Sequence, residues 1–174
     1  MTIIRTERLL LRHARADDLD AVHAIMSDAE VLRYWSTPPH RTHADTEQWL
    51  ESMIVSNANG STDFIIETNG VVIGKIGVWQ MPEIGFYLAR SAWGQGYAIE
   101  ALRAVIAHVF DGYTDHLFAD VDPRNSASLR LLMRAGFVET GRAQNTMEVN
   151  GEWCDSIYLE LNKDNYNAQM PLGG

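Results

Sequence analysis

The amino-acid sequence predicts an α/β fold of the α+β kind, with a mixed, mostly antiparallel central sheet of about six to seven strands and helices on both faces. Three observations favour it. Helical apolar spacing dominates the first third of the chain, three β patterns joined by tight turns come next, and a strand–helix–strand–helix–strand passage ends it. With 174 residues and no internal repeat or low-complexity linker, we expect one continuous domain over 1–174.

One strand and two helices are expected in the first third of the chain. "RLLLRHA" (8–14) is typical of a strand, and "ADDLDAVHAIMSD" (16–28) places apolar residues at helical spacing. The segment "STPPHRTH" then interrupts the pattern, because proline and small polar residues break helices. A second helix is expected over "HADTEQWLESMIVSN" (43–57), which ends at the turn-rich "NANGSTD".

Three strands are expected to follow in quick order and to pair as antiparallel neighbours. Asn69-Gly70 turns the first strand into the second, and this dipeptide is a strong hairpin signal. Met81-Pro82 turns the second strand into the third. The three segments are "FIIET" (64–68), "VVIGKIGVWQ" (71–80) and "EIGFYLA" (83–89).

The second half of the chain alternates between strands and helices. A helix between two strands is the crossover that parallel neighbours require, so the strands at 83–89 and 116–122 can lie parallel. The tail "NYNAQMPLGG", from about residue 165, is expected to be flexible. The expected elements are a helix over 97–110, a strand over 116–122, a helix over 126–135 closed by Gly136, and strands near 137–144 and 155–162.

Charge and composition argue against several classes of protein. The net charge is −9 and the 14 Lys and Arg residues are scattered, which opposes binding to a nucleic-acid backbone. No apolar run approaches the roughly 20 residues that cross a bilayer, and no secretory signal opens the sequence. Cys154 is the single cysteine and cannot form a disulfide within the chain. We therefore expect a cytoplasmic protein, monomeric or homodimeric, with no nucleic-acid or membrane partner.

The stretch "SAWGQGYAIEAL" (91–102) has two glycines at the point where a helical pattern begins. The first turn of a helix exposes unpaired backbone N–H groups at the positive end of the helix dipole, and Gly94 and Gly96 let an anion approach them closely. This pattern is typical of a phosphate site, although two glycines could also form a plain tight turn. Two other phosphate loops fit poorly, because Ile99 replaces the third glycine of a dinucleotide fold and Gly74-Lys75 lacks the Ser or Thr of a P-loop.

Two blocks of the sequence resemble one enzyme family. "WGQGYAIEAL" is similar to the pyrophosphate-binding motif of the GNAT acetyltransferases, Q/R-x-x-G-x-G/A, with Gly96 and Ala98 in its last two positions. Trp93 departs from the Gln or Arg of the first position, and this form resembles the Rim-type branch of ribosomal-protein N-terminal acetyltransferases. "DPRNSASLRLLMRAGF" (122–137) and the opening "TERLLLRHARADDLDAV" are similar to the same branch, so the resemblance covers residues 5 to 162.

The resemblance implies acetyl-CoA as co-substrate. No metal is expected, because His40 and His43 stand three apart with no Glu between them and no third ligand nearby in the sequence. The pantetheine arm would then lie in a splay between the strands at 83–89 and 116–122. Asn125 resembles the family's cofactor-contacting Asn, although an Asn before a helix is also a good N-cap. The residues implied to hold the pyrophosphate are Gly94, Gln95, Gly96, Tyr97, Ala98 and Ile99, and those implied to pair with the arm are Leu88, Ala89 and Arg90.

Acetyl transfer to an amine needs a base for the amine and a proton for the leaving thiolate. Glu83 is the first candidate for the base, and Asp120 is its rival; either could instead be a solvated carboxylate at a strand end. Many relatives use a Tyr as the acid, but Leu132 stands at the matching position. Ser128 could hydrogen-bond the leaving sulfur in its place.

The acceptor is expected to be an amine, either a small molecule or a protein N-terminus, with the N-terminus slightly ahead of a polyamine. The segments 28–45 and 145–154 lie where the family binds acceptors, and their excess of carboxylates would attract cations, unless it is a plain solvated face. A non-catalytic acyl-CoA-binding or interaction module of the same fold is the alternative. The carboxylates are Asp28, Glu30, Asp45, Glu148 and Glu152.

Overall fold

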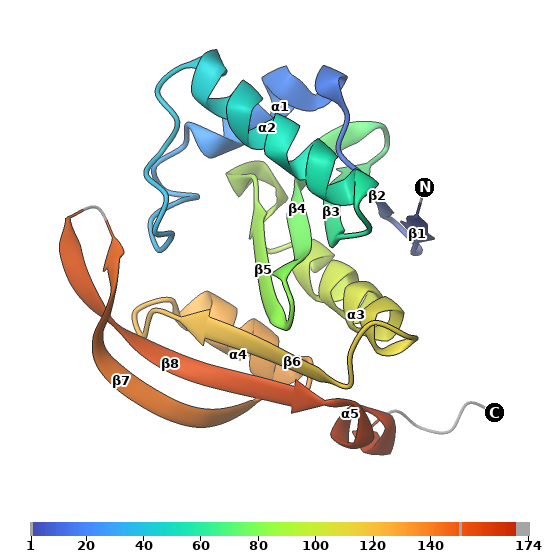
Figure 1. The fold of residues 1–174 in the computed structure, drawn as a ribbon, viewed down its shortest axis with the longest axis vertical. Helices are drawn as coiled ribbons and strands as arrows, with labels where there is room; N and C mark the ends of the chain where they lie inside the picture. Colours follow the sequence, from blue (N-terminus) through green and yellow to red (C-terminus); the bar gives the residue numbers. More distant parts are fainter. Residues whose placement is uncertain (1, 150, 170–174) are drawn as a thin grey trace.

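The computed structural model describes residues 2–149 and 151–169, which are built around one eight-stranded mixed sheet (Figure 1). The strand order is β1-β2-β3-β4-β5-β6-β8-β7. The β5–β6 pair is parallel, and every other neighbouring pair is antiparallel, as expected for a mixed, mostly antiparallel sheet. The strands are β1 (Ile3–Arg5), β2 (Leu10–Arg12), β3 (Thr62–Thr68), β4 (Val71–Gln80), β5 (Glu83–Leu88), β6 (His116–Val121), β7 (Val138–Val149) and β8 (Glu152–Asn162).

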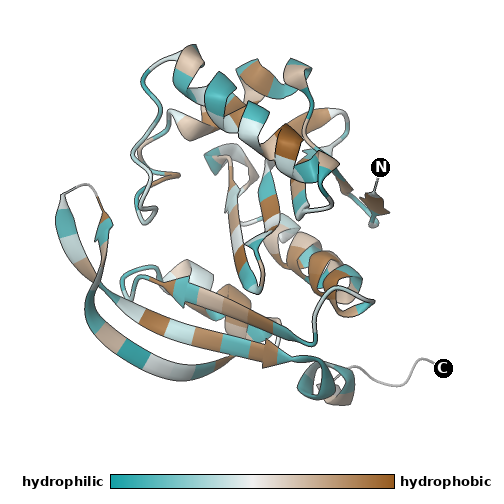
Figure 2. Cartoon of the chain, in the orientation of Figure 1, coloured by the Kyte–Doolittle hydropathy of each residue, from teal (hydrophilic) through white to brown (hydrophobic). Residues whose placement is uncertain are grey.

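Helices cover both faces of the sheet, which confirms the predicted fold class. Residues of β3 alternate between two cores: Ile65 packs with α1 and α2, whereas Phe64 and Ile66 pack with α3. Figure 2 shows hydrophobic residues concentrated in the strands and in α3. The helices are α1 (Leu19–Met26), α2 (His43–Ala58), α3 (Tyr97–Phe110), α4 (Ser126–Arg134) and α5 (Lys163–Gln169).

The number of strands corrects the prediction at the N-terminus. The strand expected over 8–14 is only Leu10–Arg12, and it pairs with a second short strand, Ile3–Arg5, that was not predicted. Three-residue strands are too short for an alternating pattern to become visible. The helix expected over 16–28 begins with a 3₁₀ turn at Ala16–Asp18 and continues as α1.

The C-terminal elements also differ from the prediction. β7 continues to Val149 and β8 begins at Glu152, so both strands are longer than predicted. The prediction stopped short because bulges near Gly141 and after Ala143 disrupt the alternation that marks a strand in sequence. The tail expected to be flexible from about residue 165 is helical in its described part, where α5 runs over Lys163–Gln169. The Tyr166 ring packs against Phe110, with the two ring centroids 5.4 Å apart. Residues 170–174 lie outside the described part.

The parallel pair β5–β6 diverges almost at once. A single residue pair, Glu83 with Phe118, joins the two strands, and the Phe118 N–H donates to the Pro82 carbonyl at 3.0 Å. β5 and β6 run in clearly different directions in Figure 1, and α3 connects them. This arrangement confirms the expectation that the two strands are parallel neighbours joined by a crossover helix.

Gly77, in the middle of β4, keeps β3 and β4 close. A Cβ at this position would collide with the Thr62 carbonyl oxygen and with Asp63. We expect Gly77→Ala to lower the free energy of unfolding by about 1–3 kcal/mol, because strand backbone must move to admit the methyl group. Urea unfolding followed by circular dichroism measures this. Gly141→Ala is the matched control, since its nearest neighbour, Tyr158 Cδ2, lies 3.6 Å away; equal stability of the two variants would contradict the expectation.

Candidate active site

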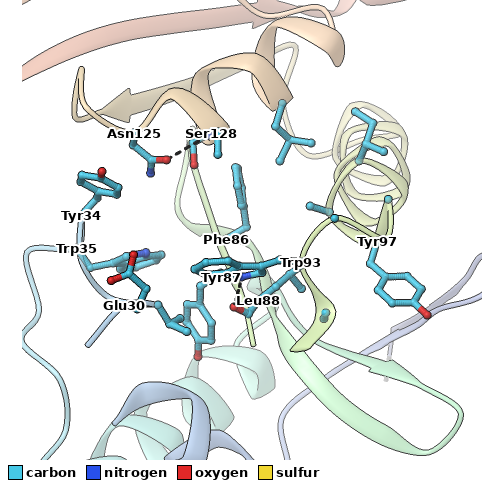
Figure 3. A pocket seen from close by; sticks show the side chains of 18 of the residues that line it. Glu30, Tyr34, Trp35, Phe86, Tyr87, Leu88, Trp93, Tyr97, Asn125 and Ser128 are labelled. Carbon is cyan, nitrogen blue, oxygen red and sulfur yellow. Dashed lines mark hydrogen bonds between the residues drawn. The ribbon is translucent and has the colours of Figure 1, made fainter. Parts of the chain in front are cut away.

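A cavity of about 560 Å³ lies where the N-termini of α3 and α4 approach the end of β5 and the loop after α1 (Figure 3). Glu30, Tyr34 and Trp35 lie on one side of it and Tyr97 on the other, with Phe86 between them. Eight of the residues predicted to act in catalysis or cofactor binding line it: Leu88, Gly94, Gly96, Tyr97, Ala98, Ile99, Asn125 and Ser128. The topology therefore gathers residues from three separate stretches of the chain.

Three residues predicted to contact the cofactor have a backbone or side-chain hydrogen bond to another part of the chain. The Ala89 N–H donates to the Ile73 carbonyl at 2.8 Å, and Arg90 Nε donates to Asp28 at 2.6 Å. Gln95 donates its side-chain N–H to the Ser91 carbonyl at 2.6 Å. None of the three is among the residues that line the cavity.

The loop before α3 has the geometry expected of an anion site. Gly94 and Gly96 have φ of +72° and +80°, a region that side chains other than glycine rarely adopt. Gly96 is the N-cap of α3 and offers no side chain to the first N–H groups of the helix. Those groups carry the positive end of the helix dipole, so they can bind a phosphate.

Trp93 occupies the motif position where Gln or Arg was expected, and the structure gives it a contact of its own. Its indole N–H donates to the Leu88 carbonyl at 2.9 Å, and its ring lines the cavity. The carbonyl at the end of β5 is therefore satisfied by a movable side chain. Sequence reasoning singled out Trp93 only as a departure from the motif.

Asn125 lies at the N-terminus of α4 and caps it. The Ser128 N–H donates to Asn125 Oδ1 at 3.2 Å, and both side chains line the cavity. The N-cap role considered for Asn125 is thus present, together with a position facing the cavity. Leu132 is fully buried in the core between α4 and the sheet, so this helix offers no acid at that position.

A second cavity of about 410 Å³ lies on the α2 side of the sheet and shares Tyr34 and Trp35 with the first. It contains Glu83 but none of the residues of the loop before α3. The cavity is lined by the loop after α1, one face of α2, and residues of β3, β4, β5 and β7. Sequence reasoning did not find the residues Trp49, Asp63, Lys75 and Met147 that contribute to it.

Glu83 and Asp120, the two candidate bases, lie close together. Glu83 pairs with Phe118, and Asp120 is two residues further along β6 on the same face. Burial raises the pKa of Glu83, and the nearby Asp120 carboxylate raises it further. Burial also raises the pKa of Asp120, and the nearby Ser156 hydroxyl opposes this rise. Two carboxylates with raised pKa values at the splay can work as proton acceptors near neutral pH.

Most of the carboxylates expected to attract a cationic acceptor have partners already. Asp28 bonds to Arg90, Glu152 lies 3.2 Å from Arg124, and Glu30 lies 3.4 Å from Arg33. Asp45 accepts backbone N–H groups at the start of α2. Arginine side chains therefore offset three of the five carboxylates, and among the described residues Asp45 and Glu148 are the two without a basic partner.

Three histidines pack where the loop between α1 and α2 meets these two helices. His40 and His23 both lie within hydrogen-bond distance of the buried Thr46 hydroxyl, at 2.9 and 2.7 Å, and the His43 ring packs 3.9 Å from that of His23. Among residues 2–149 and 151–169, no group of three or more His, Cys, Asp or Glu side chains is arranged to hold a metal ion. Over the same residues, no helix is both long and apolar enough to cross a membrane.

Known proteins match the chain over most of its length. A family model described as "Acetyltransferase (GNAT) domain" matches residues 8–138. An N-acetyltransferase of Bacillus licheniformis, p20, is 28% identical over 95% of this chain and 99% of its own. A RimL ribosomal L7/L12 α-N-protein acetyltransferase, solved with coenzyme A, has a TM-score of 0.83 and 21% identity over 94% of this chain and 99% of its own. A spermidine N-acetyltransferase of Vibrio cholerae, solved with CoA and spermine, has a TM-score of 0.79 and 20% identity over 93% and 99%.

Proposed function

The chain belongs to the GNAT acetyltransferase family and is an acetyl-CoA-dependent N-acetyltransferase, and we propose that its acceptor is a primary amine bound in the second cavity beside Glu83. One observation carries this proposal: the cavity beside the glycine loop and the cavity with the half-buried Glu83 carboxylate meet at Tyr34 and Trp35. The acceptor is a protein or peptide N-terminal α-amine or a small cationic amine. The RimL and spermidine enzymes, which share the fold, are named for one acceptor of each kind.

The first cavity fits acetyl-CoA. The backbone N–H groups from Gly94 to Ile99 would hold the pyrophosphate, since the glycines expose them and no side chain caps them. The pantetheine arm would enter the splay between β5 and β6, where its amides can replace the Trp93 indole at the Leu88 carbonyl. Arg134, which also lines this cavity, adds a cationic side chain that suits a phosphate.

Glu83 is the base in this proposal. It takes a proton from the acceptor ammonium, directly or through water, and so frees the lone pair of the amine. The amine nitrogen then bonds to the thioester carbonyl carbon and gives up its second proton, the carbon–sulfur bond breaks, and the CoA thiolate takes up a proton. Donation from the Ser128 hydroxyl stabilises the leaving sulfur, since this side chain lines the cavity where Leu132 supplies no acid. The products are an N-acetylamine, free CoA and one released proton.

Gly96→Val should weaken acetyl-CoA binding, because Gly96 has positive φ and a side chain there would crowd both Arg8 and the path to the helix N-terminus. Isothermal titration calorimetry measures the affinity, and dephosphorylated pantetheine should bind far more weakly than acetyl-CoA to the wild type. Gly70→Val is the matched control, with φ of +78° and no neighbouring atom within 4 Å. Equal acetyl-CoA affinity of the two folded variants would remove the pyrophosphate assignment.

Glu83→Gln should lower turnover by about 10²–10⁴-fold with little change in acetyl-CoA affinity, since the amide cannot accept the proton. Release of free thiol under saturating acetyl-CoA measures turnover. The isosteric change preserves the shape of the second cavity. Turnover close to that of the wild type would show that Glu83 is not the base.

The pH dependence of the rate in Asp120→Asn distinguishes the roles of Glu83 and Asp120. The base works when deprotonated, so the rate falls as pH drops through the pKa of Glu83, which burial and the Asp120 charge raise. Removing that charge lowers the pKa of Glu83, so the acidic limb should move to lower pH with the plateau retained. A plateau lowered by about 10²-fold or more would instead assign the base to Asp120.

A further inference from the structure

The second cavity holds a buried ion pair that the acetyl-transfer chemistry does not use. Lys75 Nζ lies 2.8 Å from Asp63 Oδ1, and the two residues are 4% and 6% exposed. Both line the second cavity. In a pair this buried, the positive charge of Lys75 and the negative charge of Asp63 neutralise each other, so neither residue is available to pair with a further ion.

The pair lies beyond the reacting end of the cavity. Lys75 is opposite Tyr87 in the sheet, four positions along β5 from Glu83, which corresponds to about 13 Å of strand. Gly85 lies between them, and Trp35 Cη2 would be 3.5 Å from a Cβ at that position. At Gly85, β5 therefore carries no side chain beneath the Trp35 ring, between Glu83 and the position opposite Lys75.

The walls of this passage carry four aromatic side chains, and Ser and Thr hydroxyl groups lie among them. Tyr34 and Trp35 come from the loop after α1, Trp49 from α2 and Trp79 from the end of β4. Among the described residues that line the cavity, Glu83 is the carboxylate without a basic partner, because the Asp63 charge is matched by Lys75. Glu83 is thus the uncompensated carboxylate of the cavity lining, with Asp120 close to it on β6, at the end where the amine reacts.

We propose that the acceptor is a primary monoamine with an aromatic or apolar body, and that the Asp63–Lys75 pair excludes amines with a second ammonium group. The inference rests on the proposed function. The single positive charge of the acceptor meets Glu83, and its body lies against the aromatic walls. A second ammonium group on the acceptor would lose its hydration when it enters the cavity. Lys75 would repel it there, and the Asp63 charge is already neutralised by Lys75, so nothing would compensate the cost of desolvating the second ammonium.

The test compares two amines of similar shape that differ in charge, together with one extended polyamine. Tyramine is the monoamine, and para-aminomethyl phenethylamine has a second ammonium in place of the far hydroxyl; spermidine is the extended polyamine. We expect kcat/KM for tyramine to exceed that for either polyvalent amine by about a hundredfold. A polyvalent amine acetylated as well as tyramine overturns the inference and leaves the acetyltransferase assignment intact. If acetyl-CoA binds and no amine is acetylated, the proposed acceptor chemistry fails with it.

Variants of Lys75 and Asp63 test whether the preference for tyramine comes from this ion pair. In Lys75→Met, the Asp63 carboxylate becomes available to a second ammonium, so the preference for tyramine should fall by at least about tenfold. In Asp63→Asn/Lys75→Met, both charges are gone and the preference should return toward that of the wild type. Lys163→Met, which removes the exposed partner of Asp115 far from the cavity, is the matched control. An unchanged preference in folded Lys75→Met overturns the role of the pair, and if that variant does not fold, the wild-type comparison decides.

Discussion

The divergence of β5 from β6 is the constraint on which the site depends. Backbone N–H and C=O groups that lie inside a protein need partners, and in the described part of the chain these two strands share one residue pair. The inner edge of β5 beyond Glu83 therefore presents main-chain groups that β6 does not take up. Trp93 occupies one of them, the Leu88 carbonyl, with a side chain that can move away. A ligand with amide groups of its own is the natural partner for such an edge.

Because side chains alternate along a strand, β5 contributes to both cavities, which in our proposal hold the cofactor and the base. Phe86 and Leu88 face α3 and α4 and line the first cavity, whereas Glu83 belongs to the second. The two cavities meet at Tyr34 and Trp35, residues of a loop that His23 and His40 fix to α2 through Thr46. One strand and one braced loop thus set the position of the carboxylate relative to the anion-binding loop.

The features that the sequence could predict are those with a local cause. Gly94 and Gly96 could be predicted to form an anion loop because flexible glycines and the start of a helix are adjacent in the chain. Asn125 could be predicted to cap a helix because it directly precedes one. The Asp63–Lys75 pair could not be read in this way, since Asp63 follows a turn and Lys75 interrupts an apolar strand without any local pattern. Only the β3–β4 register brings them together. The short strand at Ile3–Arg5 and the helix α5 were missed because short or polar segments carry little periodicity.

The energetics of the buried pair fit a role in selecting the acceptor better than a role in stability. Taking two charges out of water costs several kcal/mol per ion, and well-packed apolar residues of similar volume commonly stabilise a core equally well. Apolar side chains lie near the pair, since Ile65 is opposite Lys75 in the sheet and Met53 lines the same cavity. A polar pair that lines a cavity leaves the net charge of the site unchanged while it keeps a fixed positive and a fixed negative charge in place. A neutral acceptor body can lie beside it, but a second cation cannot be compensated without breaking it.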